Sequence, residues 1–310
     1  MKFNFNFDDG KPVGYIKGGI NNKEIIYLSD KDHSENKKKY NIDEMALLVE
    51  NLYKGMKGRL SFKKLEQLQD AIISRQRPIN RELANQYDEA LKIIDSSKGK
   101  EILLEDDSNL IPMWDSKAER QVFMITGMSG SGKSTYTSNL MESYHKQYRK
   151  NKVFIFSNKD EDPALDRHKF GKRIPISEDL LDDPIHLDEL RNSLVIFDDI
   201  EGNPNKKINI EMDRLRDLIL QQGRSYKTSF VYISHLANNY KQTRTILNEC
   251  NAVTVFPAMT TRYALKYLLE KYFGFEKKDI NKLVGLNSRW VTIHKAPIFV
   301  MYSKGCYLLN

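Results

Sequence analysis

The stretch Gly127-Met128-Ser129-Gly130-Ser131-Gly132-Lys133-Ser134-Thr135, GMSGSGKST, decides the fold. It matches G-x-x-x-x-G-K-[ST], and an apolar run at residues 122–125 precedes it while an amphipathic stretch follows. Glycines let the backbone turn tightly and aim N–H groups at phosphate oxygens, and the helix N-terminus adds partial positive charge. The sequence therefore predicts a P-loop between a strand and a helix, one face of which carries Tyr136, Leu140 and Tyr144.

The motif predicts a binding site for ATP and Mg²⁺. We expect Lys133 to reach the β- and γ-phosphates and the hydroxyl of Ser134 to ligate the cation. A glycine-rich turn with an accidental Lys-Ser pair is the alternative. The residues predicted to bind the nucleotide are Gly127, Ser129, Gly130, Ser131, Gly132, Lys133, Ser134 and Thr135.

Short apolar runs alternate with helical stretches in the part of the chain that follows residue 119. The runs are too short for buried helices and are rich in Val, Ile and Phe, which is typical of parallel strands. This alternation predicts an α/β fold with three layers, in which helices cover both faces of a parallel sheet. The predicted strands are residues 121–126, 153–157, 194–197, 230–234 and 252–256.

One of these strands ends in two acids, in the sequence LVIFDD at residues 194–199. A P-loop protein needs a carboxylate at such a strand end for its Mg²⁺, and Asp198 is predicted to supply it. Asp199 is then expected to orient or polarise water as the general base, with Glu201 as the competing base. An ordinary turn or helix-cap acid is the alternative for each of the three.

The order of these elements bears on the class of enzyme. The strand at residues 153–157 lies between the P-loop helix and the acidic strand, and a further strand is expected near residues 173–176. Simple nucleotide kinases usually place the P-loop strand and the acidic strand side by side. An inserted strand is compatible with the ATPases in which water attacks the γ-phosphate, although order along the chain does not fix order in the sheet.

Length and composition limit the kind of protein. With 310 residues, 40% of them hydrophobic, the chain is long enough for two domains with real cores. The sequence shows no run long enough to span a membrane and no signal peptide, and Cys250 and Cys306 cannot form a disulfide framework. We therefore predict a cytoplasmic protein without a membrane partner, and the net charge of +7 is compatible with a polyanionic partner.

The N-terminal part has a different pattern. Residues 13–28 are typical of a hairpin, residues 45–52 of an amphipathic helix capped by Asn41, and two further helices are expected after Ser61 and around residues 83–94. A short polar segment at residues 96–100 suggests a boundary between a smaller, mostly helical domain at 1–100 and an ATPase domain at 101–310. The tail, residues 289–309, is expected to add two strands, broken at Ala296-Pro297 and Lys304-Gly305.

The series of motifs resembles one superfamily of ATPases. After the P-loop and the Asp-Asp strand come Gly223-Arg224 before a strand and Ser234-His235 at the end of that strand. This pattern, over residues 119–260, resembles the FtsK/HerA superfamily of DNA-pumping ATPases, and most of all the poxvirus-type genome-packaging ATPases of double-stranded DNA viruses. The resemblance implies an ASCE-type, RecA-like P-loop NTPase fold.

The resemblance also implies roles for several residues. Arg224 matches an arginine that reaches a neighbouring subunit's nucleotide as a trans finger, with a surface salt bridge as the alternative. The family usually has Gln where this chain has Ser234-His235, so His235 takes the γ-phosphate-sensing position, and a structural histidine is the alternative.

The implied partners are double-stranded DNA, further copies of the chain in a pentameric or hexameric ring, and capsid or portal proteins. The implied location is the host cytoplasm or the virion. Lys206 and Lys207, in the polar loop after the acidic strand, are expected to grip DNA phosphates without reading sequence. Two ordinary solvated lysines are the alternative.

Two other functions fit the same motif. GxxGxGKST also opens kinases that act on nucleotides or other small molecules, and a kinase would need an arginine-bearing lid, for which no segment stands out. A nucleotide-dependent signalling switch is the third candidate. DNA-stimulated ATPase activity that depends on protein concentration would separate the motor from both.

Overall fold

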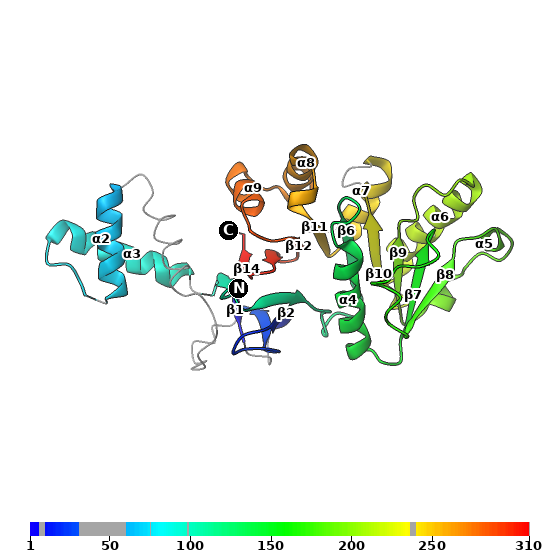
Figure 1. Ribbon diagram of the computed structural model, residues 1–310, viewed down its shortest axis with the longest axis horizontal. Coiled ribbons are helices and arrows are strands. Elements are labelled where there is room, and N and C mark those ends of the chain that lie inside the picture. Colours follow the sequence, from blue (N-terminus) through cyan, green and yellow to red (C-terminus); the bar gives the residue numbers. More distant parts are fainter. Residues whose placement is uncertain (6–9, 31–59, 75, 98, 236–239, 310) are drawn as a thin grey trace.

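The computed structural model describes residues 1–5, 10–30, 60–74, 76–97, 99–235 and 240–309. Its centre is a ten-stranded sheet in which the strands from β11 to β8 run parallel and the remaining four pair antiparallel (Figure 1). In spatial order the strands are β4 (Glu101–Leu103), β14 (Gly305–Leu308), β13 (Ile298–Tyr302), β12 (Val291–Lys295), β11 (Ala252–Val255), β6 (Val122–Thr126), β10 (Ser229–Ser234), β9 (Ser193–Asp198), β7 (Lys152–Ser157) and β8 (Gly171–Pro175).

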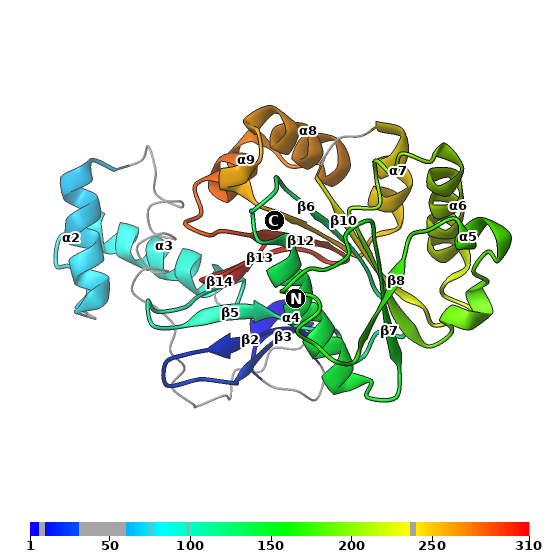
Figure 2. The ribbon, with the colours of Figure 1, turned by 45° about the vertical axis from the view of Figure 1, so that its right-hand side comes forward.

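Helices cover both faces of this sheet, as Figure 2 shows. Side chains alternate along each strand, so in β9 Leu194 and Ile196 face one layer while Val195 and Phe197 face the other. The first layer is α4 (Lys133–Gln147), whose Tyr136, Leu140 and Tyr144 are buried as predicted. The second layer contains α6 (Lys206–Gln222), α7 (Tyr240–Glu249), α8 (Arg262–Phe273) and α9 (Lys277–Val284), with the short α5 (Asp179–Asp182), η1 (Leu187–Leu190) and η2 (Pro257–Met259) in the connections.

The strand between β6 and β9 is β10. The strand at residues 153–157, β7, is not the one that separates them, because it pairs with the other edge of β9. A separating strand is present all the same, and it comes from later in the chain. The order of strands along the chain differs from their order in the sheet, because the chain leaves β9, forms α6 and then enters β10 between β6 and β9.

The tail forms three strands where two were expected. The breaks at Ala296-Pro297 and Lys304-Gly305 are both real turns, and two turns leave three segments, β12, β13 and β14. At the second turn Gly305 has a φ of 157°, and a Cβ there would lie 2.0 Å from the carbonyl oxygen of Ile102. Glycine is therefore needed where β14 meets β4.

A second, four-stranded sheet follows the order β1-β3-β2-β5 and confirms the predicted hairpin. Its strands are β1 (Lys2–Asn4), β3 (Ile25–Ser29), β2 (Lys11–Lys17) and β5 (Asn109–Pro112). Phe3, Val13 and Ile16 of this sheet share a core with Phe299 and Met301 of β13. The strand β5 lies beyond residue 100 and pairs with β2, so hydrogen bonds connect the two sides of the domain boundary expected at residues 96–100. That boundary stays a prediction.

Two further helices, α2 (Phe62–Ile73) and α3 (Arg81–Ser97), match those expected after Ser61 and around residues 83–94. They pack on each other through a small core of their own that includes Leu65, Leu68 and Tyr87, and they stand apart from both sheets (Figure 1). The helix expected at residues 45–52 lies outside the described residues. Across the residues that the structure describes, none of the helices has the length and apolar character needed to cross a membrane.

Candidate nucleotide site

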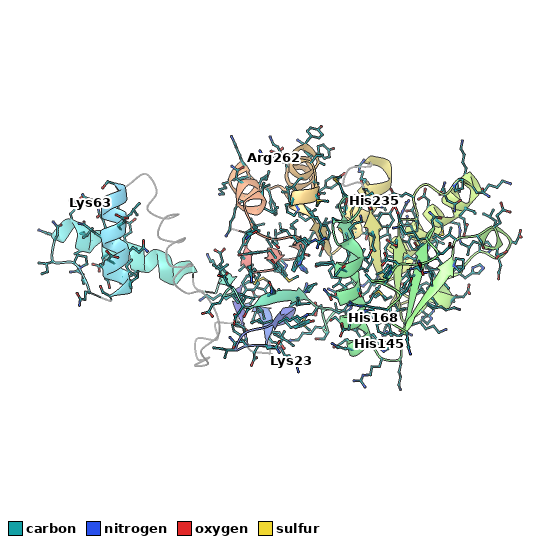
Figure 3. The ribbon with its side chains drawn as sticks, viewed as in Figure 1. Lys23, Lys63, His145, His168, His235 and Arg262 are labelled. Atoms are coloured by element: carbon teal, nitrogen blue, oxygen red, sulfur yellow. The ribbon has the colours of Figure 1, made fainter. Side chains whose placement is uncertain are left out.

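The predicted site residues meet at one edge of the parallel strands. Register places Ser234 of β10 beside Thr126 of β6, and Asp198 of β9 beside Ser157 of β7. The carboxyl ends of parallel strands lie at the same edge of a sheet, which is where ligands bind in such folds. The sheet therefore gathers the P-loop, the acidic pair and His235 at a single edge; Figure 3 labels His235 there.

The P-loop has the backbone of a phosphate cradle. Gly130 and Gly132 have φ values of 74° and 109°, which glycine adopts without strain, and Gly132 is the N-cap of α4. The Nζ of Lys133 donates to the carbonyl oxygens of Gly127 and Met128 at 2.7 and 3.0 Å. Burial lowers the pKa of Lys133, and Asp199 partly opposes that shift. A buried ammonium held at the mouth of the loop is placed to meet an anion.

Asp198 faces the P-loop helix because it has the same parity along β9 as Leu194 and Ile196, which pack in the α4 layer. It is 2% exposed and accepts a hydrogen bond from the hydroxyl of Ser157 at 3.3 Å. Burial raises the pKa of Asp198, which the nearby ammonium of Lys159 counteracts. A desolvated carboxylate of this kind gains most from a cation beside it.

Asp199 is turned back into the site by its backbone, whose φ is 55°. Its Oδ1 lies 3.0 Å from His235 Nε2, and its Oδ2 lies 3.2 Å from Lys159 Nζ. Burial raises the pKa of Asp199, but the hydrogen bond and charge of His235 and the ammonium of Lys159 outweigh burial, so the pKa is lowered. Since His235 Nδ1 is also 3.4 Å from the Nζ of Lys133, His235 connects the P-loop lysine to the second acid.

Glu201, the competing base, is held elsewhere. Its Oε1 accepts hydrogen bonds from the hydroxyls of Tyr232 at 2.6 Å and Ser234 at 3.3 Å. Tyr232 packs in the layer of α6 to α9, on the face of the sheet opposite α4. Burial and the charge of Glu201 both raise the pKa of Tyr232, which keeps this hydroxyl a donor. Asp199 contacts the groups around Lys133, and Glu201 contacts the hydroxyls of β10.

Two cationic residues at the site have no counterpart in the predictions. Lys159 follows β7 and pairs with Asp199, and the polar break after an apolar strand was its sequence signal. Arg289, which precedes β12, donates from Nε to the carbonyl oxygen of Ser131 at 2.8 Å and from Nη2 to that of Gly130 at 3.0 Å. No local pattern marks Arg289, because only the return of the tail to β11 brings it to the P-loop.

Three predicted residues lie away from the P-loop contacts. Lys206 and Lys207 were expected in a loop, and this prediction is wrong: they are the first two residues of α6. The Asn205 side chain caps this helix by accepting a hydrogen bond from the backbone N–H of Lys207. Both lysines are exposed. Arg224 lies in the exposed turn between α6 and β10, at the amino end of β10, and its charge acts on Arg120 just before β6. It is therefore at the sheet edge opposite its own P-loop.

The donors at this edge suit a hard cation held mainly by phosphates. Ser134 and Asp198 offer a hydroxyl and a carboxylate, and Mg²⁺ is usually bound by one or two carboxylates together with substrate phosphates. Within the described part of the chain, His, Cys, Asp and Glu side chains form no cluster of three that would bind a metal without such help. The residues present therefore fit a cation that arrives with a nucleotide.

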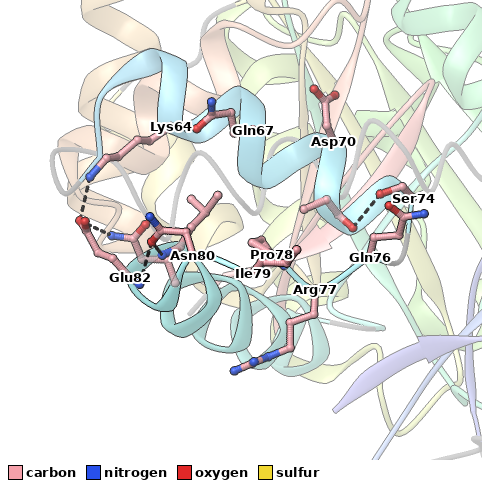
Figure 4. A pocket seen from close by; sticks show the side chains of 13 residues that line it. Lys64, Gln67, Asp70, Ser74, Gln76, Arg77, Pro78, Ile79, Asn80 and Glu82 are labelled. Atoms are coloured by element: carbon pink, nitrogen blue, oxygen red, sulfur yellow. Dashed lines mark hydrogen bonds and ion pairs between the residues drawn. The ribbon is translucent and has the colours of Figure 1, made fainter.

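Two cavities lie outside these contacts. One of about 830 Å³ runs along α4 between the helix and the four-stranded sheet, from Thr135 at the P-loop end to Lys146. The other, of about 730 Å³, lies between α2 and α3 and is lined by polar groups such as Asn80 and the Lys64–Glu82 ion pair (Figure 4). It contains no residue predicted to bind the nucleotide.

Comparison with known proteins places the chain in a family. It is 37% identical over 220 residues to "Uncharacterized protein V3" of the Sputnik virophage, a match that spans 69% of this chain and 87% of that protein. The chain belongs to the family of this virophage protein. No protein-family model matches it.

Structural comparison also matches part of the chain to solved structures of viral proteins. The genome packaging NTPase B204 from Sulfolobus turreted icosahedral virus 2, in complex with AMPPCP, is 12% identical with a TM-score of 0.41, covering 60% of this chain and 98% of that chain. B204, the DNA-packaging ATPase from Sulfolobus turreted icosahedral virus, is 12% identical with a TM-score of 0.41, covering 59% and 97%.

Proposed function

We propose that this protein is an ATP-hydrolysing motor of the FtsK/HerA type, with a RecA-like P-loop fold, that translocates double-stranded DNA and packages a viral genome as an oligomeric ring. The observation that carries the proposal is the meeting of Lys133 and Ser134 with Asp198 and Asp199 at one sheet edge. The strand β10 between β6 and β9 supports an ATPase over a nucleotide kinase. The virophage relative supports a viral setting.

The chain's own residues divide the work of hydrolysis. Lys133 and the N–H groups of residues 127–135 would bind the phosphates of ATP, and Ser134 and Asp198 would hold Mg²⁺, which neutralises phosphate charge when bound. Asp199 would orient the attacking water, because His235 and Lys159 keep its carboxylate ionised and fixed in place. His235 would report the occupied site, since it touches both Lys133 and Asp199.

Arg224 is the reason to propose a ring. It is exposed at the sheet edge opposite its own P-loop, so it is available only to the site of another copy. A guanidinium supplied in trans can contribute about 10³–10⁵ to kcat in P-loop hydrolases. Exposed Lys206 and Lys207, at the carboxyl edge beside the acidic strand, would contact DNA phosphates.

The test is the ATPase rate per subunit as a function of protein concentration, with and without duplex DNA. We expect the wild-type rate to rise with both, and Arg224→Ala to lose at least about tenfold of the stimulated rate while nucleotide affinity is retained. Arg149→Ala, an exposed arginine after α4, is the matched control. An unchanged Arg224→Ala variant would remove the trans finger, and phosphate transfer to a small acceptor would establish a kinase instead.

A further inference from the structure

The hydroxyl of Ser134 already has a carboxylate partner, and it is not Asp198. Ser134 Oγ donates to Asp162 Oδ2 at 2.8 Å. Asp162 follows β7 in the loop that leads to β8, and neither the P-loop motif nor the acidic strand predicts it. Asp198 has a different partner, the hydroxyl of Ser157. Asp162 and Asp198 therefore have different hydroxyl partners at this edge of the sheet.

A brace within its loop fixes the position of Asp162. Its Oδ1 accepts from the backbone N–H groups of Ala164 and Leu165 at 2.9 and 3.2 Å, and its own N–H donates to Asp166 Oδ2 at 2.6 Å. Asp166 in turn is held by Arg173 of β8, whose Nη2 lies 2.8 Å from both carboxylate oxygens. The chain of contacts from β8 to the P-loop leaves Oδ2 as the oxygen aimed at Ser134.

The direction of this hydrogen bond has a chemical consequence. A serine hydroxyl has one donor and two acceptor lone pairs. When Asp162 accepts the hydrogen bond from the hydroxyl, the lone pairs of Oγ remain free for a cation. Asp162 also adds negative charge near Asp198, since its charge raises the pKa of that carboxyl.

We propose that Asp162 is a positioning residue for the metal: it orients the hydroxyl of Ser134 so that this oxygen can ligate the Mg²⁺ of the bound nucleotide. This inference rests on the proposed nucleotide site and adds a residue to it. Partners one step beyond a ligand commonly contribute 10- to 100-fold to metal affinity. Asp162 acts on the metal through Ser134 and does not need to touch it.

The test variant is Asp162→Asn, which is isosteric. Its carbonyl oxygen can still cap Ala164 and Leu165, while an NH₂ group that cannot accept a hydrogen bond replaces Oδ2. The readout is the affinity for an ATP analogue, measured in EDTA and over a series of Mg²⁺ concentrations. We expect the Mg²⁺ concentration for half-maximal tightening to rise about tenfold, while affinity in EDTA stays at the wild-type value. Asp160→Asn, an exposed acid in the same loop, is the control.

A double-mutant cycle with Ser134→Ala tests whether Asp162 acts through the hydroxyl. We expect the double variant to be no worse than Ser134→Ala alone, since the effects of residues in one contact chain do not add. The inference is overturned if Asp162→Asn keeps the wild-type Mg²⁺ response, weakens binding equally in EDTA, or adds in full to Ser134→Ala. If instead Lys133→Ala and Ser134→Ala bind the analogue as the wild type does, the proposed function itself fails.

Discussion

The parallel and antiparallel halves of the central sheet differ in what their strand ends carry. From β11 to β8 every strand runs the same way, and Lys133, Lys159, Asp198, Asp199 and His235 all lie at or just after the carboxyl ends of these strands. In the antiparallel half, β12, β13, β14 and β4, successive strands end at opposite edges, so no edge collects a set of functional loops. Direction of the strands, more than composition, decides which half becomes a site.

The antiparallel half has a structural role and one point of contact with the site. Phe299, Met301 and Cys306 join the core beneath the four-stranded sheet, and His294 is buried in β12. Arg289, at the start of this half, reaches across to the P-loop carbonyls. Substitutions in the two halves should therefore have different readouts: hydrolysis in one, stability in the other, and nucleotide affinity at Arg289.

The largest effect is expected in the parallel half, at Asp199. Asp199→Asn should lower kcat about a thousandfold and leave ATP affinity close to wild type, because it removes the carboxylate that orients water and keeps its shape. Steady-state hydrolysis and equilibrium binding of ATP measure the two quantities. Glu201→Gln is the paired variant, and we expect it to lose far less, since Glu201 is tied to Tyr232 and Ser234. A larger loss in Glu201→Gln would exchange the two roles.

The pH profile sharpens the same comparison. Because His235 and Lys159 lower the pKa of Asp199 below its ordinary value, protonation of this carboxylate should reduce activity only below the pH at which a free aspartate titrates. The hydrolysis rate of the wild type, measured as a function of pH, should therefore show no decrease above that pH that is missing in Asp199→Asn.

A smaller effect is expected where the halves touch. Arg289→Ala should weaken ATP binding about tenfold with kcat little changed, because it removes two charge-assisted hydrogen bonds to carbonyl oxygens of the P-loop. Arg289→Lys should recover only part of this, since an ammonium cannot make the two-pronged contact. Arg262→Ala, an exposed arginine at the start of α8, is the control. Equal affinity in Arg289→Ala and the wild type would confine the site to the parallel half.

Sequence reasoning worked where function depends on local pattern. The P-loop, the strand ending in Asp198 and the helix face of Tyr136 and Leu140 each follow from spacing within about fifteen residues, which is the range over which periodicity informs. The parallel half of the sheet and the hairpin at the N-terminus follow from the same kind of signal.

What could not be predicted depends on contacts distant in the chain. The position of β10 between β6 and β9 depends on pairings between strands that are distant in the chain. Arg289 reaches the loop only because the tail returns antiparallel to β11. Gly202 and Pro204 are typical of a loop, so the sequence predicts Lys206 and Lys207 in that loop. In the structure Asn205 ends the loop and caps α6, and the two lysines begin the helix.

The smallest effect we predict is on stability, in the antiparallel half. His294 is buried in β12, stacked on Phe299 with ring centroids 4.1 Å apart, and neither ring nitrogen has a hydrogen-bond partner among the described residues. Burial, aided by the charge of Lys11, lowers the pKa of His294 to about 3. In the unfolded chain this histidine has a pKa near 6.5 and binds a proton below that pH, whereas in the folded protein it stays neutral down to its lowered pKa. The free energy of unfolding is therefore highest above pH 6.5 and falls as the pH decreases toward the pKa of the folded state. Between pH 6.5 and 5.5 the free energy of unfolding should fall by roughly 1 kcal/mol because of this group.

Urea unfolding at the two pH values measures this change. His294→Met, which has a similar volume and cannot titrate, should flatten the pH dependence of the free energy of unfolding. His186→Gln, at an exposed histidine, should keep that dependence. If His294→Met retained the full wild-type slope while hydrolysis was lost, β12 would belong to the functional half of the sheet after all.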